Sequence, residues 1–229
     1  MFNIKFIKNI ILDGGRLRAL GRTGLCTRVF ARQGDLDGSC TVYSLIMMLI
    51  FHQKLDWEDV TKSEQANENK FVDAFQREFL KDLKGLCYGG HTLEDISERL
   101  NLCYRRKLSD VYTSISGKSN SISRQELHNK IKFQLDERKP VQISYGRESG
   151  EGHSLVAIGY GKEGNMMRLF CLDPGVILRV MQIWNNVIEI DLLPSYNELS
   201  DINHYEEKRV YLHSILIIND NPPELDCPF

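Results

Sequence analysis

The residues best suited to covalent chemistry are a cysteine and a histidine that lie far apart along the chain. Cys40 follows a polar, glycine-containing loop at 33–39 and begins an apolar segment that ends near His52. This pattern predicts a buried helix with the thiol in its first turn, where unpaired backbone N–H groups and the helix dipole favour the thiolate. Such a thiolate is a nucleophile for acyl transfer, although Cys40 could equally be one of the many cysteines that are simply buried.

A cysteine nucleophile needs a base, and His153 is the best placed of the six histidines. His153 opens an apolar run at 152–160, so its ring can be held rigidly at the end of a strand. His52 would lie twelve residues along the helix of Cys40, roughly 18 Å away, which is too far for contact. The other four have simpler interpretations as surface or structural histidines: His91, His128, His204 and His213.

Asp173 is a candidate for the residue that orients the imidazole of His153. It follows a second apolar run at 168–172, which can return antiparallel to the strand of His153 after a turn at 161–165. In such a hairpin the carboxylate comes back toward the ring and can fix its tautomer. The sequence Asp173-Pro174-Gly175 also suits an ordinary turn, and taken alone that is the better interpretation.

Helical and strand-forming segments are segregated along the chain. After a strand or an extended arm at 2–12 and a short strand at 26–30, amphipathic or capped helices are expected at 57–62, 67–85, 92–100 and 123–139. Thr92 with Asp95 and Ser123 with Glu126 have the spacing of capping boxes. Strands are expected at 141–145, 152–161, 166–172, 176–183, 187–192 and 210–219. Helices followed by strands predict an α+β fold.

The bulk composition indicates an ordinary globular protein. The 229 residues suffice for one sizeable domain, which we expect at 1–220, with a helical part at roughly 33–138, a sheet part at roughly 139–219 and a loose tail at 221–229. With 29 basic and 31 acidic residues the net charge is -2, so there is no electrostatic reason to expect a nucleic-acid partner. The six scattered cysteines indicate no disulfide framework.

The sequence predicts a cytoplasmic protein with no membrane association. The N-terminal segment has no uninterrupted apolar core of signal-peptide length, and no apolar run reaches the length of a membrane span. Secretion as an effector without a cleavable signal stays open. Cys87 and His91 are spaced four apart, but the two glycines between them argue against a helix face and no second ligand pair is evident, so no metal site is expected.

Three stretches together resemble the papain-like cysteine peptidases, and most closely the bacterial peptidase C39-like group. They are Gln33…Gly38-Ser39-Cys40 with its apolar helix, Gly152-His153 with the apolar strand after it, and Leu172-Asp173-Pro174. The resemblance implies a papain-like fold, in which an N-terminal helical lobe carries the nucleophile and a C-terminal antiparallel β-sheet lobe carries the histidine and aspartate. A cleft between the lobes would hold the substrate.

Carried over by position, the resemblance implies a role for each of four residues. Cys40 would be the nucleophile, His153 the general base and then acid, Asp173 the orienting residue, and Gln33 an oxyanion-hole donor. Gln33 precedes Cys40 by seven residues, one more than is usual in the family, so a one-residue bulge would be needed between them. No cofactor or metal is implied.

The function expected from this resemblance is hydrolysis of peptide bonds through an acyl-enzyme. The partners would be a peptide or protein substrate and a regulatory protein. Two alternatives stay open. The same residues could serve a glutamine deamidase or transamidase-type effector, or the domain could be a catalytically degenerate papain-fold binding module.

Overall fold

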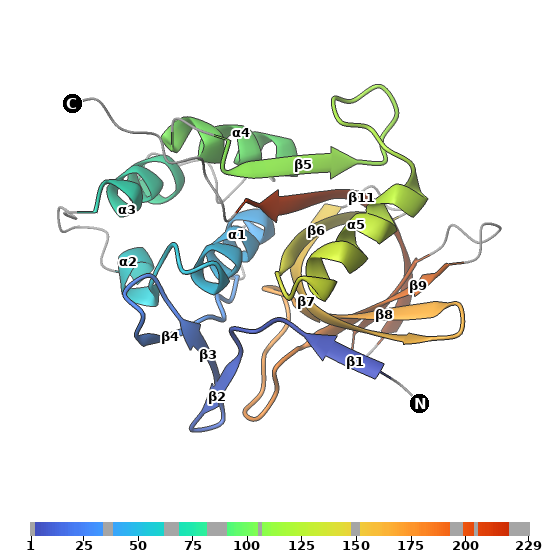
Figure 1. Ribbon diagram of the computed structural model, residues 1–229, viewed down its shortest axis with the longest axis horizontal. Coiled ribbons are helices and arrows are strands. Elements are labelled where there is room, and N and C mark those ends of the chain that lie inside the picture. Colours follow the sequence, from blue (N-terminus) through green and yellow to red (C-terminus); the bar gives the residue numbers. More distant parts are fainter. Residues whose placement is uncertain are drawn as a thin grey trace.

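The computed structural model describes residues 3–33, 39–61, 69–81, 91–104, 107–147, 152–192, 199–203 and 206–219. Most of the helices lie on one side of the molecule and a strongly curved sheet lies on the other (Figure 1). This is the predicted α+β, papain-like arrangement. The tail expected at 221–229 lies outside the described residues.

The central helix is α1 (Cys40–Phe51), which the apolar segment after residue 39 predicts. It is buried along nearly its whole length and packs against the strands of the large sheet, because almost every position carries an apolar side chain. The other helical segments surround it or cover the sheet: α2 (Trp57–Thr61), α3 (Lys70–Phe75), the π-helical η1 (Gln76–Lys81), α4 (Leu93–Cys103) and α5 (Arg124–Asp136).

The helix starts follow the capping signals in the sequence. Both predicted capping boxes are present, at Thr92 before α4 and at Ser123 before α5. The helix expected at 67–85 begins at Lys70 after an Asn69 cap, and its α-helical part ends at Phe75, where η1 takes over. The remainder of that prediction falls on 82–85, outside the described residues.

Six strands of the large sheet close into a ring. Antiparallel pairing runs β6–β7, β7–β8, β8–β9, β9–β10, β10–β11 and returns from β11 to β6. Their bounds are β6 (Val141–Arg147), β7 (Gly152–Glu163), β8 (Met166–Leu172), β9 (Asn186–Asp191), β10 (Leu199–Asn203) and β11 (Glu206–Ile218). Closure leaves each ring strand paired on both sides, which removes the exposed edges of an open sheet.

Two further strands pair with strands of the ring, and three others form a separate small sheet. β1 (Asn3–Phe6) pairs with β7, and β5 (Ser109–Thr113) pairs with β11. The small antiparallel sheet consists of β2 (Ile11–Asp13), β3 (Arg16–Leu20) and β4 (Cys26–Arg28).

The segment 2–12, expected as a strand or an extended arm, is divided between two sheets, with β1 at its start and β2 at its end. The break coincides with Asn9, whose side chain pairs with the backbone of Leu20 at 2.7 and 2.8 Å and donates to the Phe51 carbonyl at 3.2 Å. The side-chain amide thus takes hydrogen bonds that a neighbouring strand would otherwise make.

The prediction of a strand at 176–183 is also wrong. This segment belongs to a non-strand connection at 174–185, which we call the 174–185 loop. Side-chain and backbone bonds hold the loop: Asn185 donates to the Val176 carbonyl at 2.7 Å, and the Met181 amide donates to the Gly15 carbonyl at 2.8 Å. Its apolar side chains do not alternate between core and solvent, since Val180 and Met181 in succession are 72% and 69% exposed.

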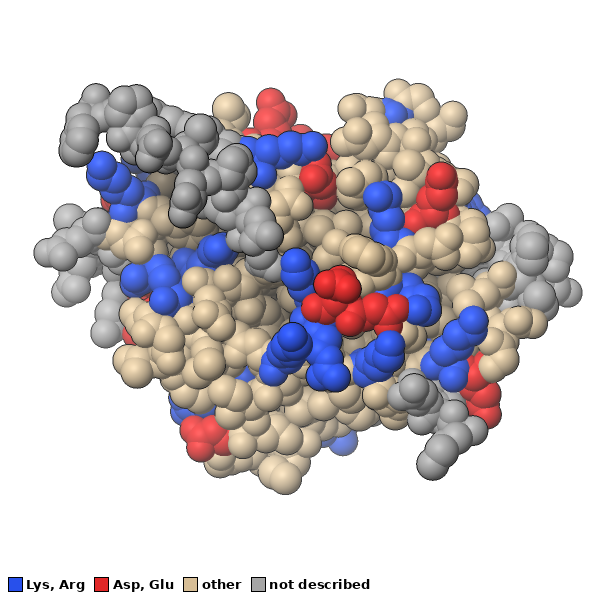
Figure 2. All heavy atoms as spheres, in the orientation of Figure 1, with Lys and Arg blue, Asp and Glu red and all other residues tan. Residues whose placement is uncertain are grey.

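The N-terminal strand is tied to α5 by an ionic cluster around Asp136. Lys5 of β1 contacts the Asp136 carboxylate at 2.5 Å, Tyr160 of β7 donates to it at 2.6 Å, and Lys132 forms a further ion pair with it. Figure 2 shows acidic side chains ringed by basic ones near the centre of this face, over the end of α5. No helix among the described residues has both the length and the apolar character needed to span a membrane.

Candidate active site

The candidate nucleophile, Cys40, is the first residue of α1, as the sequence predicts. Cys40 is only 8% exposed, and its Sγ lies 4.0 Å from the Thr41 hydroxyl. Ser39 precedes it as N-cap without a side-chain capping bond. The thiol therefore lies at the positive end of the helix, where backbone N–H groups favour a negative charge.

Cys40 and His153 meet at a cavity of about 290 Å³ that both residues line. Burial alone would raise the pKa of the thiol, but the hydrogen bond and charge of His153 outweigh it and lower the pKa of Cys40 below its ordinary value. Burial likewise acts to lower the pKa of His153, whereas its bonds to Asp173 and Cys40 raise it to about 10. Both shifts favour a thiolate next to an imidazolium.

Asp173 contacts the opposite side of the same ring. Its Oδ1 lies 2.7 Å from His153 Nε2, and the residue is only 3% exposed. The predicted hairpin explains the contact: β7 and β8 pair with Val156 opposite Leu172, so the start of β7 and the end of β8 lie together. Burial would raise the pKa of Asp173, but the bond to His153 and those from neighbouring amides hold it below the usual range.

Two adjacent asparagines hold the carboxylate and backbone of Asp173. Asn186 Nδ2 donates to Asp173 Oδ2 at 2.8 Å, while the backbone N–H of Gly175 donates to Oδ1 at 2.8 Å. Asn185 accepts from the Asp173 amide at 2.7 Å and donates to its carbonyl at 2.8 Å. Neither asparagine was predicted as a site residue, because their only sequence signal is an Asn-Asn pair at the start of an apolar strand.

Gln33 lies beside the turn that follows Asp173. Its backbone N–H donates to the Pro174 carbonyl at 2.9 Å. The structure thus brings Cys40, His153 and Asp173 together through their side chains and attaches Gln33 to them through its backbone. The one-residue bulge expected between Gln33 and Cys40 would fall at 34–38, outside the described residues.

A buried amide links the helix of the cysteine to the strand of the histidine. Gln142 of β6 donates from Nε2 to the Thr41 carbonyl at 2.8 Å and to the Ser154 hydroxyl at 3.0 Å. Ser44 of α1 adds a bond to the Ser154 carbonyl at 3.1 Å. Thr41 follows Cys40 and Ser154 follows His153, so this network fixes the relative position of the two reactive side chains.

His213 lines the cavity as well, although its sequence context suggests only a structural histidine. The pairing of β11 with β6 shifts register between Leu212 and Ser214, which is a bulge at His213. The ring lies directly over Gly146, where an added Cβ would come within 2.3 Å of the His213 Cε1 atom. His91 and Glu94, from the start of the α4 region, line the same cavity.

No cluster of three metal-ligating side chains occurs within the described ranges, and Cys87 lies outside them. A family model with the description "Peptidase_C39 like family" matches residues 29–198, a range that includes Gln33, Cys40, His153 and Asp173. No curated protein matches the chain.

Proposed function

The chain belongs to the peptidase C39-like family, a group of papain-like cysteine peptidases, and on this premise we propose that it hydrolyses peptide bonds with Cys40, His153 and Asp173. The observation that carries the proposal is that Cys40 and His153 line one cavity while Asp173 contacts the His153 ring, with 2.7 Å between His153 Nε2 and Asp173 Oδ1. A thiol, an imidazole and an orienting carboxylate in that order are what acyl transfer requires.

In the proposed reaction, the Cys40 thiolate attacks the carbonyl carbon of the scissile amide. His153, present as the imidazolium, then protonates the leaving amine as the C–N bond breaks, which leaves a thioester on Cys40. The neutral imidazole next removes a proton from water, and the hydroxide attacks the thioester, which releases the carboxylic acid and restores the Cys40 thiolate next to the imidazolium. Asp173 keeps the imidazole oriented and stabilises its charged form throughout.

The developing oxyanion would be stabilised at the N-terminus of α1. Backbone N–H groups at the start of the helix point toward this position, and we propose the Gln33 side chain as the second donor. Support comes from the hydrogen bond between Gln33 N–H and the Pro174 carbonyl, which holds this residue next to Asp173. A Gln33→Ala variant should acylate more slowly, while Cys40 should remain the residue that an active-site inhibitor labels.

An epoxide-type inhibitor of papain-like peptidases tests the proposal directly. The expected result is one adduct per chain, mapped by mass spectrometry to Cys40 and abolished in Cys40→Ser. The matched control is Cys26→Ser, which removes an exposed cysteine and should leave labelling unchanged. Adducts spread over several cysteines, or labelling that persists in Cys40→Ser, would exclude Cys40 as the nucleophile.

The same chemistry on a glutamine side chain would make the protein a deamidase. Mass spectrometry of a proteome treated with the protein separates the two activities. New N-termini support the peptidase, whereas a Gln-to-Glu mass shift without cleavage would replace peptide-bond hydrolysis with deamidation. An unchanged proteome after confirmed Cys40 labelling would favour a binding module.

A further inference from the structure

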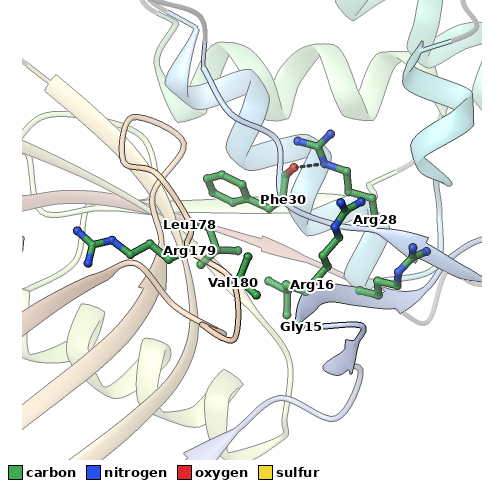
Figure 3. A pocket seen from close by; sticks show the side chains of 9 residues that line it. Gly15, Arg16, Arg28, Phe30, Leu178, Arg179 and Val180 are labelled. Atoms are coloured by element: carbon green, nitrogen blue, oxygen red, sulfur yellow. Dashed lines mark hydrogen bonds between the residues drawn. The ribbon is translucent and has the colours of Figure 1, made fainter.

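A second cavity, of about 340 Å³, lies between the small sheet and the 174–185 loop. One wall is formed by strands β3 and β4, which contribute Arg16, Arg18 and Arg28. The other is formed by the loop, with Leu178, Arg179 and Val180. Figure 3 shows Arg16 and Arg28 projecting side by side from the strand wall, whereas Arg179 of the loop points away from them.

The strand register places like charges against one another. Arg18 is directly opposite Arg28 in the β3–β4 pairing, and Arg16 lies on the same face of β3 because side chains alternate along a strand. Opposed like charges destabilise a sheet. Within the described part of the chain, the carboxylate that forms an ion pair with this cluster is Asp13, whose Oδ2 lies 3.1 Å from Arg18 Nε. The positive charge of the face is thus only partly neutralised.

The guanidinium of Arg28 is held in place and keeps donors available. Its Nε donates to the Phe30 carbonyl at 2.9 Å, and its guanidinium carbon lies 4.4 Å from the centre of the Trp57 ring. Burial, followed by the charge of Arg16, lowers the pKa of Arg28. A fixed guanidinium with free terminal N–H groups is suited to bind a carboxylate through two parallel hydrogen bonds.

This cavity is connected to the candidate active site through two short stretches of chain. Phe30, which lines it, precedes Gln33 by three residues, or about 10 Å of extended chain at most. On the other wall, the 174–185 loop starts directly after Asp173 and is bonded to Gly15 through Met181. Gly15 has φ +74, and a Cβ there would come within 2.8 Å of Val180, so glycine allows this close approach.

We propose that the cavity at Arg16 and Arg28 is a subsite for acidic side chains of the polypeptide substrate. This inference rests on the proposed function, because it takes the ligand to be part of the chain that is cleaved. A peptide fits the combination of guanidinium groups with an apolar wall of Phe30, Leu178 and Val180: a glutamate or aspartate would bind the arginines while a neighbouring apolar side chain packs against the loop.

Fluorescence anisotropy with the full chain carrying Cys40→Ala tests this subsite without catalysis. The probe is a fluorescein-labelled peptide of Glu-Leu-Gly repeats, compared with the same peptide carrying Gln for Glu. We expect the glutamate peptide to bind about fivefold more tightly, and Arg28→Gln or Arg16→Gln to remove this preference. The matched control is Arg179→Gln, which changes the same charge at the rim and should alter the affinity by less than about twofold.

Three results would overturn the proposal: equal affinity for both peptides, an equal loss in Arg179→Gln, or stronger Arg28-dependent binding of a single-stranded oligonucleotide of matched charge. Melting curves of each variant show whether it is folded, so that a loss of binding can be separated from a loss of structure. Because peptide binding is measured on the Cys40→Ala chain, a negative binding result does not affect the separate test by Cys40 labelling. Conversely, failure of Cys40 labelling leaves the peptide preference measurable.

Discussion

At the scale of single residues, the chemistry depends on how three titratable groups shift one another. His153 contacts Asp173 on one side and Cys40 on the other, and its bonds to them, together with their negative charges, favour its charged form. Asn186 in turn fixes the Asp173 carboxylate, which contributes most to raising the pKa of His153. The reactivity of Cys40 therefore depends on all three groups together. A substitution of His153 or Asp173 should change the rate at which the Cys40 sulfur reacts.

Iodoacetamide at mildly acidic pH should alkylate Cys40 before the other five cysteines. The reason is its lowered pKa, which leaves a larger thiolate fraction below the pKa of an ordinary thiol. His153→Ala should slow this reaction by about tenfold or more, because it removes the stabilising charge. The readout is peptide mapping over time, with His128→Ala as the matched control. Equal reactivity of all six cysteines would contradict the prediction.

The pH profile of this alkylation should change in a defined direction in Asp173→Asn. The ion pair exists above the lowered pKa of Cys40 and below the raised pKa of His153, about 10. Loss of the carboxylate removes the main contact that raises the pKa of His153, so the upper limit of the ion pair moves to lower pH. Alkylation rates measured across the pH range should show the step at the His153 pKa at lower pH in Asp173→Asn, whereas Asp110→Asn should not move it.

The sequence alone was sufficient to predict those candidate residues that have a local sequence signal. Cys40 has the loop-to-helix boundary, His153 the start of an apolar strand, and Asp173 the end of the partner strand. The supporting residues could not be found in this way. Asn186 and Gln142 are polar residues in strands whose partners are distant in sequence, so only the tertiary structure defines what their amides contact.

At the scale of elements, α1 must be fixed against the ring of strands for the thiol to reach the imidazole. Gln142 does this by bridging the Thr41 carbonyl and the Ser154 hydroxyl, one residue after each reactive side chain. It is fully buried, so the groups that it satisfies have no access to water when it is removed.

Gln142→Leu should therefore destabilise the protein by about 1–3 kcal/mol, because it leaves a buried carbonyl and hydroxyl without that partner. Urea denaturation followed by circular dichroism measures the change. The control is Gln125→Leu on the exposed face of α5, which should shift the free energy of unfolding by less than about 0.5 kcal/mol. A Gln142→Leu variant as stable as the wild type would show that the bridge contributes nothing.

The elements themselves were predictable to different degrees. Both capping boxes and the strands of the β7–β8 hairpin were found, because their signals are local and consistent. The strand predicted at 176–183 is part of the 174–185 loop, because its Val, Ile and Leu residues have strand propensity but do not alternate between core and solvent. β10 was missed, since its polar sequence Leu-Ser-Asp-Ile-Asn carries no strand signal.

At the scale of the whole molecule, Asp136 joins parts of the chain that are far apart in sequence. Lys5, Lys132 and Tyr160 all contact its carboxylate and come from β1, α5 and β7. Burial would raise the pKa of Asp136, but these hydrogen bonds lower it well below its usual range. The charged form of Asp136 is thus the one that the folded state favours.

Asp136→Asn should reduce the free energy of unfolding by about 1 kcal/mol at neutral pH, a modest value because the cluster is partly exposed to solvent. The folded pKa is depressed, so this contribution is present above the ordinary value of 3.8 and is lost as the pH falls through the folded pKa. Urea denaturation at neutral and mildly acidic pH should give the same difference from the wild type. A difference that disappears already at mildly acidic pH would contradict the assignment, and Glu137→Gln is the matched control.

The ring of strands determines when the cavity at Cys40 can be completed during synthesis of the chain. β11 closes the ring by pairing with β6 and β10, and it carries His213 and Ser214 to the cavity of Cys40. Because β11 follows every other strand of the ring, a nascent chain can complete this cavity only after Ile218 has left the ribosome. The cavity at Cys40 is therefore completed late in synthesis, when the last strand of the ring pairs.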